Sequence, residues 1–381
     1  MSGGVVKAAA WHLGVALAMD EMGFTFKNNR QGHQSSDLEA SNLEISTYVG
    51  SSAGAMAAIY FAMGYTPQEI INSTLGLKNT PLKSITYKDM LSLKNPLRKP
   101  ARSIVYGPFD SFPIGIRHLL RPLASITGLF TVSGIENYLK NNVLNIKTFD
   151  EFVPDVFIVA TQLDHSRKVI FGKYNYPNPS HDNTAVYYTQ TPIAEAACAS
   201  MAVPPFYSPY PIKNRVTNQI DYYIDGEIRE TLSTHVAADN NCDVVISSYT
   251  HTPYHYQEEI GSLINYGLPA ICLQSIYLLI QKKIVAAQAR RAMARDILDT
   301  IFDYMKSENF TDKQIRKLLA ILERKMHFNP NIKYIDIFPK HQNYKLFFAN
   351  SFSLNPKIAS LAVRAGHKRT LEVFRNQEWQ W

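Results

Sequence analysis

The chain has 381 residues, of which 46% are hydrophobic and 12% aromatic. This composition excludes a disordered protein and is sufficient for one large domain or two smaller ones. Cys198, Cys242 and Cys272 are odd in number and lack CxxC or metal-ligand spacing, which excludes a disulfide framework and a zinc site. The longest apolar run, residues 267–280, is too short to span a bilayer and predicts a buried helix.

The formal net charge is +7, and much of it is concentrated in residues 83–121, which contain eight basic residues and two acidic ones. The bases alternate with aliphatic, aromatic and proline residues, a pattern that suits an anionic lipid surface. We therefore expect peripheral membrane contact through this segment, with a simply solvated surface as the alternative. No recognised nucleic-acid-binding signature accompanies the bases, so no nucleic-acid partner is expected.

The first residues, Met1-Ser2-Gly3-Gly4, lack the basic and apolar regions of a secretory signal. The expected location is therefore cytoplasmic or peripheral to a membrane. Residues 8–22 carry apolar positions at helical spacing and end at Gly23, which predicts a helix. An apolar run at 43–49 predicts a strand, and an alanine-rich run at 53–63 predicts a second helix.

Thr66, followed by a proline and by Glu69, predicts the capping box of the next helix. Further strands are expected where short runs are rich in Val, Ile, Phe or Tyr. These runs are residues 155–161, 168–171, 219–224 and 243–247. Strands that alternate with helices indicate an α/β fold with a mainly parallel sheet.

Beyond about residue 256 the pattern becomes helical, with a long run at 266–306 and a second helix that opens with a capping box of Thr311 and Gln314. We expect a first domain at 1–255 and a helical C-terminal extension at 256–381 packed on it. The long run carries bases that predict a solvated helix face: Lys282, Lys283, Arg290, Arg291 and Arg295.

Ser52 lies in Gly50-Ser51-Ser52-Ala53-Gly54, between the expected strand and helix. This strand–turn–helix setting is typical of a nucleophile elbow, in which a sharp turn exposes the serine hydroxyl. Gly50 and Gly54 are needed because the turn leaves no room for side chains two positions away on either side. The pattern predicts a serine esterase.

A serine nucleophile needs a base and donors for the oxyanion that forms. Gly3 and Gly4 precede a helix, where a glycine-rich turn aims backbone N–H groups at one point. A phosphate loop or a flexible end fits this pair equally well. Asp225-Gly226 ends a strand-like run, where sheet enzymes place catalytic carboxylates, although a turn-forming aspartate fits as well.

Together these residues resemble the patatin-like phospholipase family. The resemblance rests on four motifs in the family's order: Ser2-Gly3-Gly4-Val5-Val6-Lys7 with His12-Leu13-Gly14, the elbow at 50–54, residues 199–209 (ASMAVPPFYSP), and Asp225-Gly226. It implies a three-layer α/β/α fold and a Ser52–Asp225 dyad without histidine. It further implies hydrolysis of acyl esters in phospholipids or neutral lipids, with no metal or organic cofactor.

The same resemblance implies that the N–H groups of Gly3, Gly4 and Val5 bind the oxyanion, with Lys7 stabilising the loop or the negative charge. Val5 replaces the family's third glycine, and a β-branched residue resists positive φ. Lys7 replaces the usual arginine, and Glu227 replaces the glycine that follows Asp-Gly. The family has a strand leading into the glycine motif, so we expect a strand-deficient sheet at Ser2.

Two alternatives remain open from the residues alone. A Ser–His–Asp α/β-hydrolase would take its histidine from the residues after Asp225, where His235, His251 and His255 are the candidates. A catalytically weak or inactive lipid-binding protein with the same fold would also contain these motifs. For the patatin-like enzyme the expected partner is a phospholipid or another acyl-ester lipid.

Overall fold

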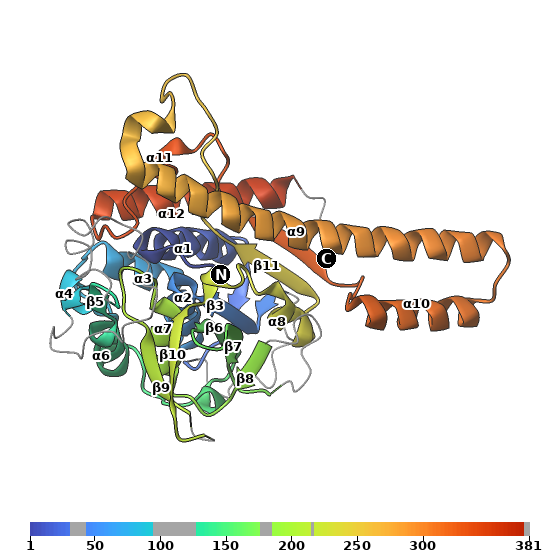
Figure 1. Cartoon of the computed structure of the whole chain (residues 1–381), viewed down its shortest axis with the longest axis horizontal. Coiled ribbons are helices and arrows are strands. Elements are labelled where there is room, and N and C mark those ends of the chain that lie inside the picture. The colour runs from blue at the N-terminus through green and yellow to red at the C-terminus, as the bar shows by residue number, and fades with distance from the viewer. Residues whose placement is uncertain (31–42, 94–126, 176–184, 215–216, 377–381) are drawn as a thin grey trace, which may run out of the picture.

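The computed structural model describes residues 1–30, 43–93, 127–175, 185–214 and 217–376 (Figure 1). A six-stranded sheet lies at the centre of the body, with the strand order β8-β7-β6-β10-β9 and β3 beside β6. Its strands are β3 (Thr47–Ser51), β6 (Asp155–Gln162), β7 (Arg167–Phe171), β8 (Ala185–Tyr188), β9 (Tyr210–Lys213) and β10 (Ile220–Asp225). The strands expected at 155–161, 168–171 and 219–224 are thereby confirmed.

The sheet is mixed, and the expected mainly parallel sheet is wrong for these strands. The β3–β6 and β7–β8 pairs are parallel, whereas β6–β7, β6–β10 and β9–β10 are antiparallel. The physical reason lies in the connections, because a short turn joins β6 and β7 and few residues separate β9 from β10 along the chain. A parallel pair needs a long crossover, so a short turn produces an antiparallel pair. The α/β class itself is confirmed.

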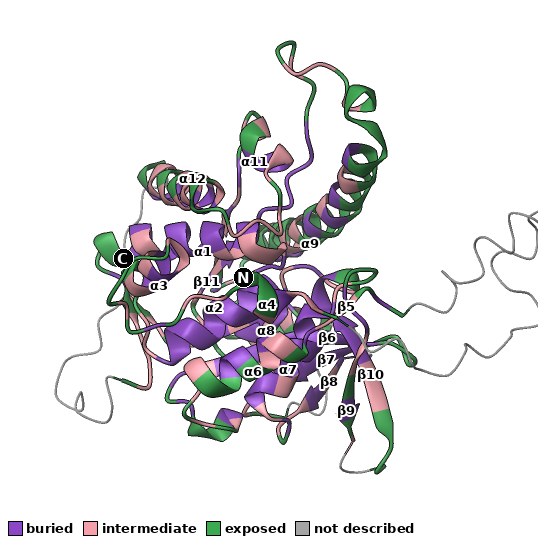
Figure 2. Cartoon of the chain, turned by 90° about the vertical axis from the view of Figure 1, so that its left-hand side faces the viewer, coloured by how far each residue is buried: buried purple, intermediate pink, exposed green. Residues whose placement is uncertain are grey.

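Both faces of β6 are buried, so helices lie on both sides of the sheet. Val156, Ile158 and Ala160 pack into the main core cluster, and Phe157 packs with Val236 on the other face. The main cluster contains residues of α2 (Ala53–Ala62), α6 (Ser133–Asn142) and α7 (Ile193–Met201). The second cluster is closed by α8 (Thr234–Asp239). Figure 2 shows the buried residues concentrated in the sheet and in α1 and α2.

Helix α1 (Val5–Glu21) packs against α12 (Pro356–Arg375), which lies beside it in Figure 1. The two backbones approach closely, because a Cβ added to Gly14 would lie 2.0 Å from the carbonyl oxygen of Val363. Strand β11 (Val244–Ser248) pairs in parallel with β12 (Lys333–Ile337). The C-terminal segment therefore contains a strand as well as helices, and the domain boundary at 255 stays a prediction.

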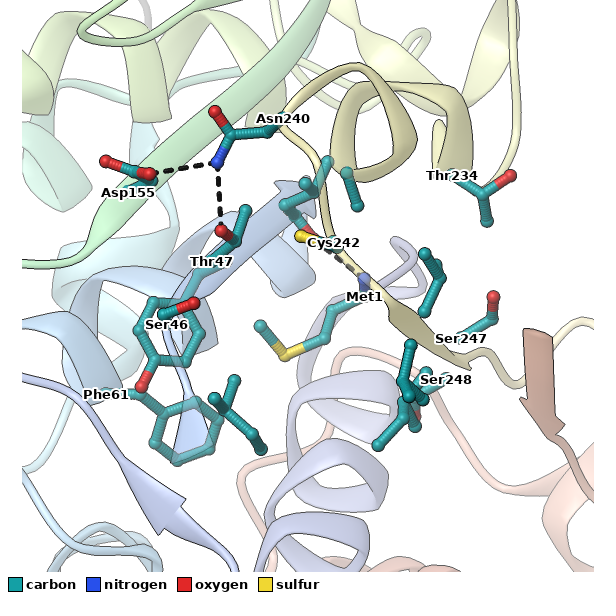
Figure 3. Close-up of a pocket in the computed structure, with 18 of the residues that line it drawn as sticks. Met1, Ser46, Thr47, Phe61, Asp155, Thr234, Asn240, Cys242, Ser247 and Ser248 are labelled. Atoms are coloured by element: carbon teal, nitrogen blue, oxygen red, sulfur yellow. Dashed lines mark hydrogen bonds between the residues drawn. The ribbon is translucent and has the colours of Figure 1, made fainter. Parts of the chain in front are cut away.

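Met1 and Ser2 bridge the edges of β3 and β11. The Met1 nitrogen donates to the Val49 oxygen (2.8 Å), and the Ser2 nitrogen donates to the Ser248 oxygen (3.0 Å). Beside them a cavity of about 370 Å³ separates the two strands, with Met1 between Thr47 and Ser248 in Figure 3. No strand from the described parts of the chain fills this cavity.

Helix α9 (Gly267–Ser307) extends beyond the body, and α10 (Asp312–Met326) returns beside its far half (Figure 1). The capping boxes predicted at Thr66 and Thr311 are both present. The expectation that residues 267–280 are buried is wrong, because only 11% of the most apolar 18 residues of this helix are buried. A single stripe of the helix faces the body, and hydropathy alone does not reveal how many faces of a helix find a partner.

The remaining elements are short and connect the larger ones. They are β1 (Thr25–Phe26), β2 (Glu44–Ile45), α3 (Pro67–Thr74), α4 (Tyr87–Met90), β4 (Ser92–Leu93), β5 (Phe130–Thr131), η1 (Phe149–Glu151), η2 (Gly226–Ile228), η3 (Leu263–Tyr266) and α11 (Tyr344–Phe348). Most of the predicted membrane segment at 83–121 lies outside the described residues, since only 83–93 is described. Membrane contact through that segment stays a prediction.

Candidate active site

Ser52 lies at the sharp turn between β3 and α2, as the motif predicts. Its backbone has φ 53° and ψ −119°, a positive φ that is unfavourable for any residue with a Cβ. The Ser52 N–H donates to Ser200 Oγ (2.8 Å), and Ser200 Oγ donates to the Val159 carbonyl (2.6 Å). Ser200 thus holds the strained turn against β6, a role that the motif at 199–209 did not reveal.

The glycines on either side of Ser52 occupy positions where a side chain does not fit. A Cβ on Gly50 would lie 2.3 Å from the carbonyl oxygen of Gly54, and one on Gly54 would lie 2.2 Å from the carbonyl oxygen of Met1. Neither position therefore accepts a side chain while the turn keeps this conformation.

Asp225 reaches Ser52 through the pairing of β6. Ser51 of β3 pairs with Val159 of β6, and Asp225 of β10 pairs with Ala160, the next residue of β6. The Ser52 side chain lies next to the Asp225 carboxylate and lowers its pKa. Two residues that are far apart in sequence are thus placed together by adjacent positions of one strand.

The Asp225 carboxylate is buried, with 1% of the residue exposed. Burial raises its pKa from 3.8 to about 6, and the nearby Ser52 side chain and the hydrogen bond from the Glu227 N–H (2.8 Å to Oδ1) offset part of this rise. The carboxylate is therefore ionised at neutral pH and close enough to its titration range to accept a proton. Gly226 is also constrained, because a Cβ there would lie 2.3 Å from the Val159 oxygen.

The glycine-rich N-terminal turn lies against the serine. A Cβ added to Gly3 would lie 2.8 Å from Ser52 Cβ, so Gly3 is in direct contact with the elbow. Gly4 has φ 125° and Val5 has φ 59°, so Val5 adopts the left-handed conformation that a β-branched residue resists. Helices α1 and α2 begin at Val5 and Ala53, so two positive helix ends converge on the site.

Glu227 accepts a hydrogen bond from one of the expected oxyanion donors. Its Oε1 accepts the N–H of Gly3 at 2.9 Å. No described residue accepts a hydrogen bond from the N–H of Gly4 or Val5. Burial, and then the charge of Asp225, raise the pKa of Glu227 to about 8, so it is protonated at neutral pH. The only signal for this contact in the sequence is that Glu227 departs from the family pattern.

Lys7 holds the N-terminal turn in place. Its ammonium group is buried and donates to Tyr277 Oη and to the Leu346 carbonyl, both at 3.1 Å. These partners belong to α9 and α11, so the C-terminal segment helps to position the residues beside Ser52.

The three histidines considered for a Ser–His–Asp triad have other partners. His235 contacts Lys168 and Glu230, His251 contacts Tyr277, and His255 contacts His341. Within the described ranges, the hydrogen bonds of Ser52 and Asp225 involve no histidine. The geometry therefore gives no support to the triad.

A cavity of about 110 Å³ opens beside Ser52. Its lining is mostly apolar and includes Val6, Leu13, Met56, Ala57, Met201 and Val203. Such a lining suits an aliphatic chain held next to the serine hydroxyl. No group of His, Cys, Asp or Glu side chains among the described residues has the arrangement of a metal site.

The fold and the site define an α/β protein with a serine at a strand–turn–helix junction, a buried carboxylate beside it and an apolar pocket. A protein-family model described as patatin-like phospholipase matches residues 1–238, and the chain belongs to this family. Members of this family hydrolyse lipids, which places the chain among the lipid acyl hydrolases. Compared with the curated proteins, the chain matches none.

The raised pKa of Glu227 predicts a stability cost at high pH. The folded-state pKa of this carboxyl lies above its unfolded value, so its contribution to stability is lost as the pH rises from about 4.5 to about 8. Glu227→Gln cannot ionise and keeps an oxygen for the Gly3 N–H. We expect it to raise the unfolding free energy at pH 8 by on the order of 2 kcal/mol, with little change at pH 4.5. Urea unfolding at both pH values measures this, and equal changes at both would contradict it.

Proposed function

We propose that the chain is a lipid acyl hydrolase of the phospholipase A or lysophospholipase type, with Ser52 as nucleophile and Asp225 as general base. The observation that supports this most is the position of the Ser52 side chain next to the buried Asp225 carboxylate, which follows from the pairing of β3 and β10 with adjacent residues of β6. Asp225 holds the role that histidine takes in a triad, because its raised pKa makes it a stronger base than an exposed carboxylate.

In the proposed reaction, Ser52 Oγ attacks the ester carbonyl while Asp225 takes the hydroxyl proton. The negative charge that develops on the carbonyl oxygen is stabilised by the N–H groups of Gly4 and Val5 and by the two helix N-termini. Asp225 returns the proton to the leaving alcohol, which departs and leaves an acyl-serine. Water then attacks the acyl-serine while Asp225 takes its proton, and Asp225 returns this proton to Ser52 Oγ as the fatty acid is released.

The alternative of a weak enzyme that chiefly binds lipid is favoured by one observation. The Gly3 N–H is bound to Glu227, so one of three expected donors is occupied. When Glu227 is ionised, its negative charge lies next to the proposed oxyanion and opposes it. The proposed activity is therefore limited to the pH range in which Glu227 carries a proton.

A fluorophosphonate probe should label the chain at Ser52. We expect Ser52→Ala to abolish labelling and hydrolysis of a soluble nitrophenyl ester, whereas Ser51→Ala, the matched control in the same turn, keeps both. Asp225→Asn should lower kcat by about 100-fold or more, since general-base catalysis typically contributes that much. Labelling that persists in Ser52→Ala would sink the assignment of the nucleophile.

The two raised pKa values predict a bell-shaped pH dependence. We expect kcat/KM for a soluble ester to rise as the pH passes about 6, where Asp225 ionises, and to fall above about 8, where Glu227 ionises. In Glu227→Gln the fall at high pH should disappear while the rise near 6 remains. A profile of the same shape in both proteins would show that Glu227 does not limit the reaction.

The close approach of Gly3 to Ser52 gives a steric test of the oxyanion loop. Gly3→Ala places a Cβ 2.8 Å from Ser52 Cβ and 2.9 Å from Glu227 Cγ, so the loop and the elbow must separate. A misplacement of about 1 Å in an active site can cost about 100-fold in rate. We therefore expect kcat to fall by about that factor while the helical circular dichroism signal is kept. Unchanged kcat would argue against this loop as the oxyanion site.

A further inference from the structure

The first half of α9 presents an apolar surface to solvent. No charged residue occurs between Ile260 and Gln281. The large apolar residues that are exposed here and in the preceding turn are Ile264 and Tyr266 of η3 and Leu268, Ile271, Ile276, Leu278 and Leu279 of α9, which together we call the α9 apolar surface. Leu268 is 71% exposed and Leu279 is 64% exposed, so neither packs on the body. A continuous exposed patch of this kind marks an interaction site.

A single stripe of the helix packs on the rest of the chain. Tyr277 and Ile284, two turns apart, are buried together with Ile280, and Ile280 and Ile284 pack against Tyr249. On a helix, Leu268 and Leu279 lie on the side opposite Tyr277, since residues eleven apart share a face. The α9 apolar surface is therefore the face that the body leaves uncovered.

The charges beside this surface are basic. Lys282 and Arg290 are exposed and lie on or near the same helix face as Leu279. The next residue in each case contacts the body instead. Lys283 donates to the Ile228 carbonyl, and Arg291 pairs with Asp336. The first acidic residue of α9 is Asp296, so an apolar face bordered only by bases is presented to solvent.

We infer that the α9 apolar surface docks on an anionic lipid bilayer. Apolar side chains beside exposed bases are the features of helices that lie in the bilayer interface, where the bases attract anionic head groups. By length and composition alone, the helix at residues 263–307 is also long and apolar enough to cross a membrane. The buried stripe excludes crossing in this packed state, because Tyr277, Ile280 and Ile284 remain on the body. The helix therefore lies along the bilayer with its outer face inserted.

The docking surface is connected to the catalytic residues. Tyr277, on the buried stripe of α9, accepts the hydrogen bond from Lys7 Nζ, and Val5, two residues before Lys7, lines the pocket beside Ser52. A bilayer held by α9 is thus held close to the N-terminal turn. This inference rests on the proposed lipid substrate for its purpose, but its binding test does not depend on catalysis.

Vesicle sedimentation tests the inference directly. The full chain is mixed with vesicles of phosphatidylcholine alone or of an equal mixture of phosphatidylcholine and phosphatidylglycerol. We expect Leu268→Gln combined with Leu279→Gln to weaken binding to the mixed vesicles by about tenfold or more, because two apolar anchors are lost. Lys282→Gln combined with Arg290→Gln should weaken binding to the mixed vesicles only.

The matched control is Leu318→Gln combined with Ile321→Gln, which changes two exposed apolar residues of α10. This control should bind like the unchanged protein, and all variants should hydrolyse a soluble nitrophenyl ester at the same rate. Equal loss in the control, or no loss in the α9 variant, would overturn the docking role. If Leu268→Gln with Leu279→Gln dissociates an oligomer and leaves vesicle binding intact, the α9 apolar surface is instead an interface with a second copy of the chain.

Cys272 provides an independent probe, since it is exposed within this stretch whereas Cys198 is buried. With Cys242→Ser as background, an environment-sensitive fluorophore on Cys272 should shift to shorter wavelength when mixed vesicles are added. An unchanged spectrum under conditions where the protein sediments with the vesicles would show that docking uses another surface. An inactive protein that still shows the shift would overturn the proposed catalysis and leave the docking intact.

Discussion

The register of β6 is the constraint on which the proposed catalytic pair depends. Val159 pairs with Ser51 and Ala160 pairs with Asp225, so adjacent residues of one strand place the elbow and the carboxylate side by side. A register slip of one residue would turn the side chains of a strand to the opposite face of the sheet. The apolar residues on both faces of β6 oppose such a slip, and the core packing therefore fixes the geometry of the site.

The site costs stability in ways that the rest of the fold has to offset. Ser52 and Val5 have positive φ, and Asp225 and Glu227 are buried carboxyls with raised pKa values. Strained backbone residues cost on the order of 1–3 kcal/mol each and persist only where the surroundings impose them, and buried carboxyls add a desolvation cost. Here the surroundings are the bonds of Ser200 to the elbow and the close packing of α1 on α12.

The sequence allowed the local parts of the site to be predicted, because a strand–turn–helix junction and a capping box depend on neighbouring residues. Ser52, Gly50 and Gly54 were found in this way. The antiparallel partners of β6 and the bond between Gly3 and Glu227 join residues that are far apart in the chain, and no local pattern specifies them. The sequence does not predict the exposure of residues 267–280 for a related reason. An apolar run indicates that a helix needs a contact partner, but it does not show whether the rest of the chain provides one.

Lys7 shows how the C-terminal segment contributes to the chemistry near Ser52. Its buried ammonium group donates to Tyr277 Oη and the Leu346 carbonyl, which are neutral, and no carboxylate among the described residues pairs with it. That charge contributes, after burial, to lowering the pKa of His251 to about 3. A positive charge that is felt inside the protein also favours negative charge nearby, as the proposed oxyanion requires. The helix that we infer to dock on lipid therefore also holds the cation that supports the proposed reaction.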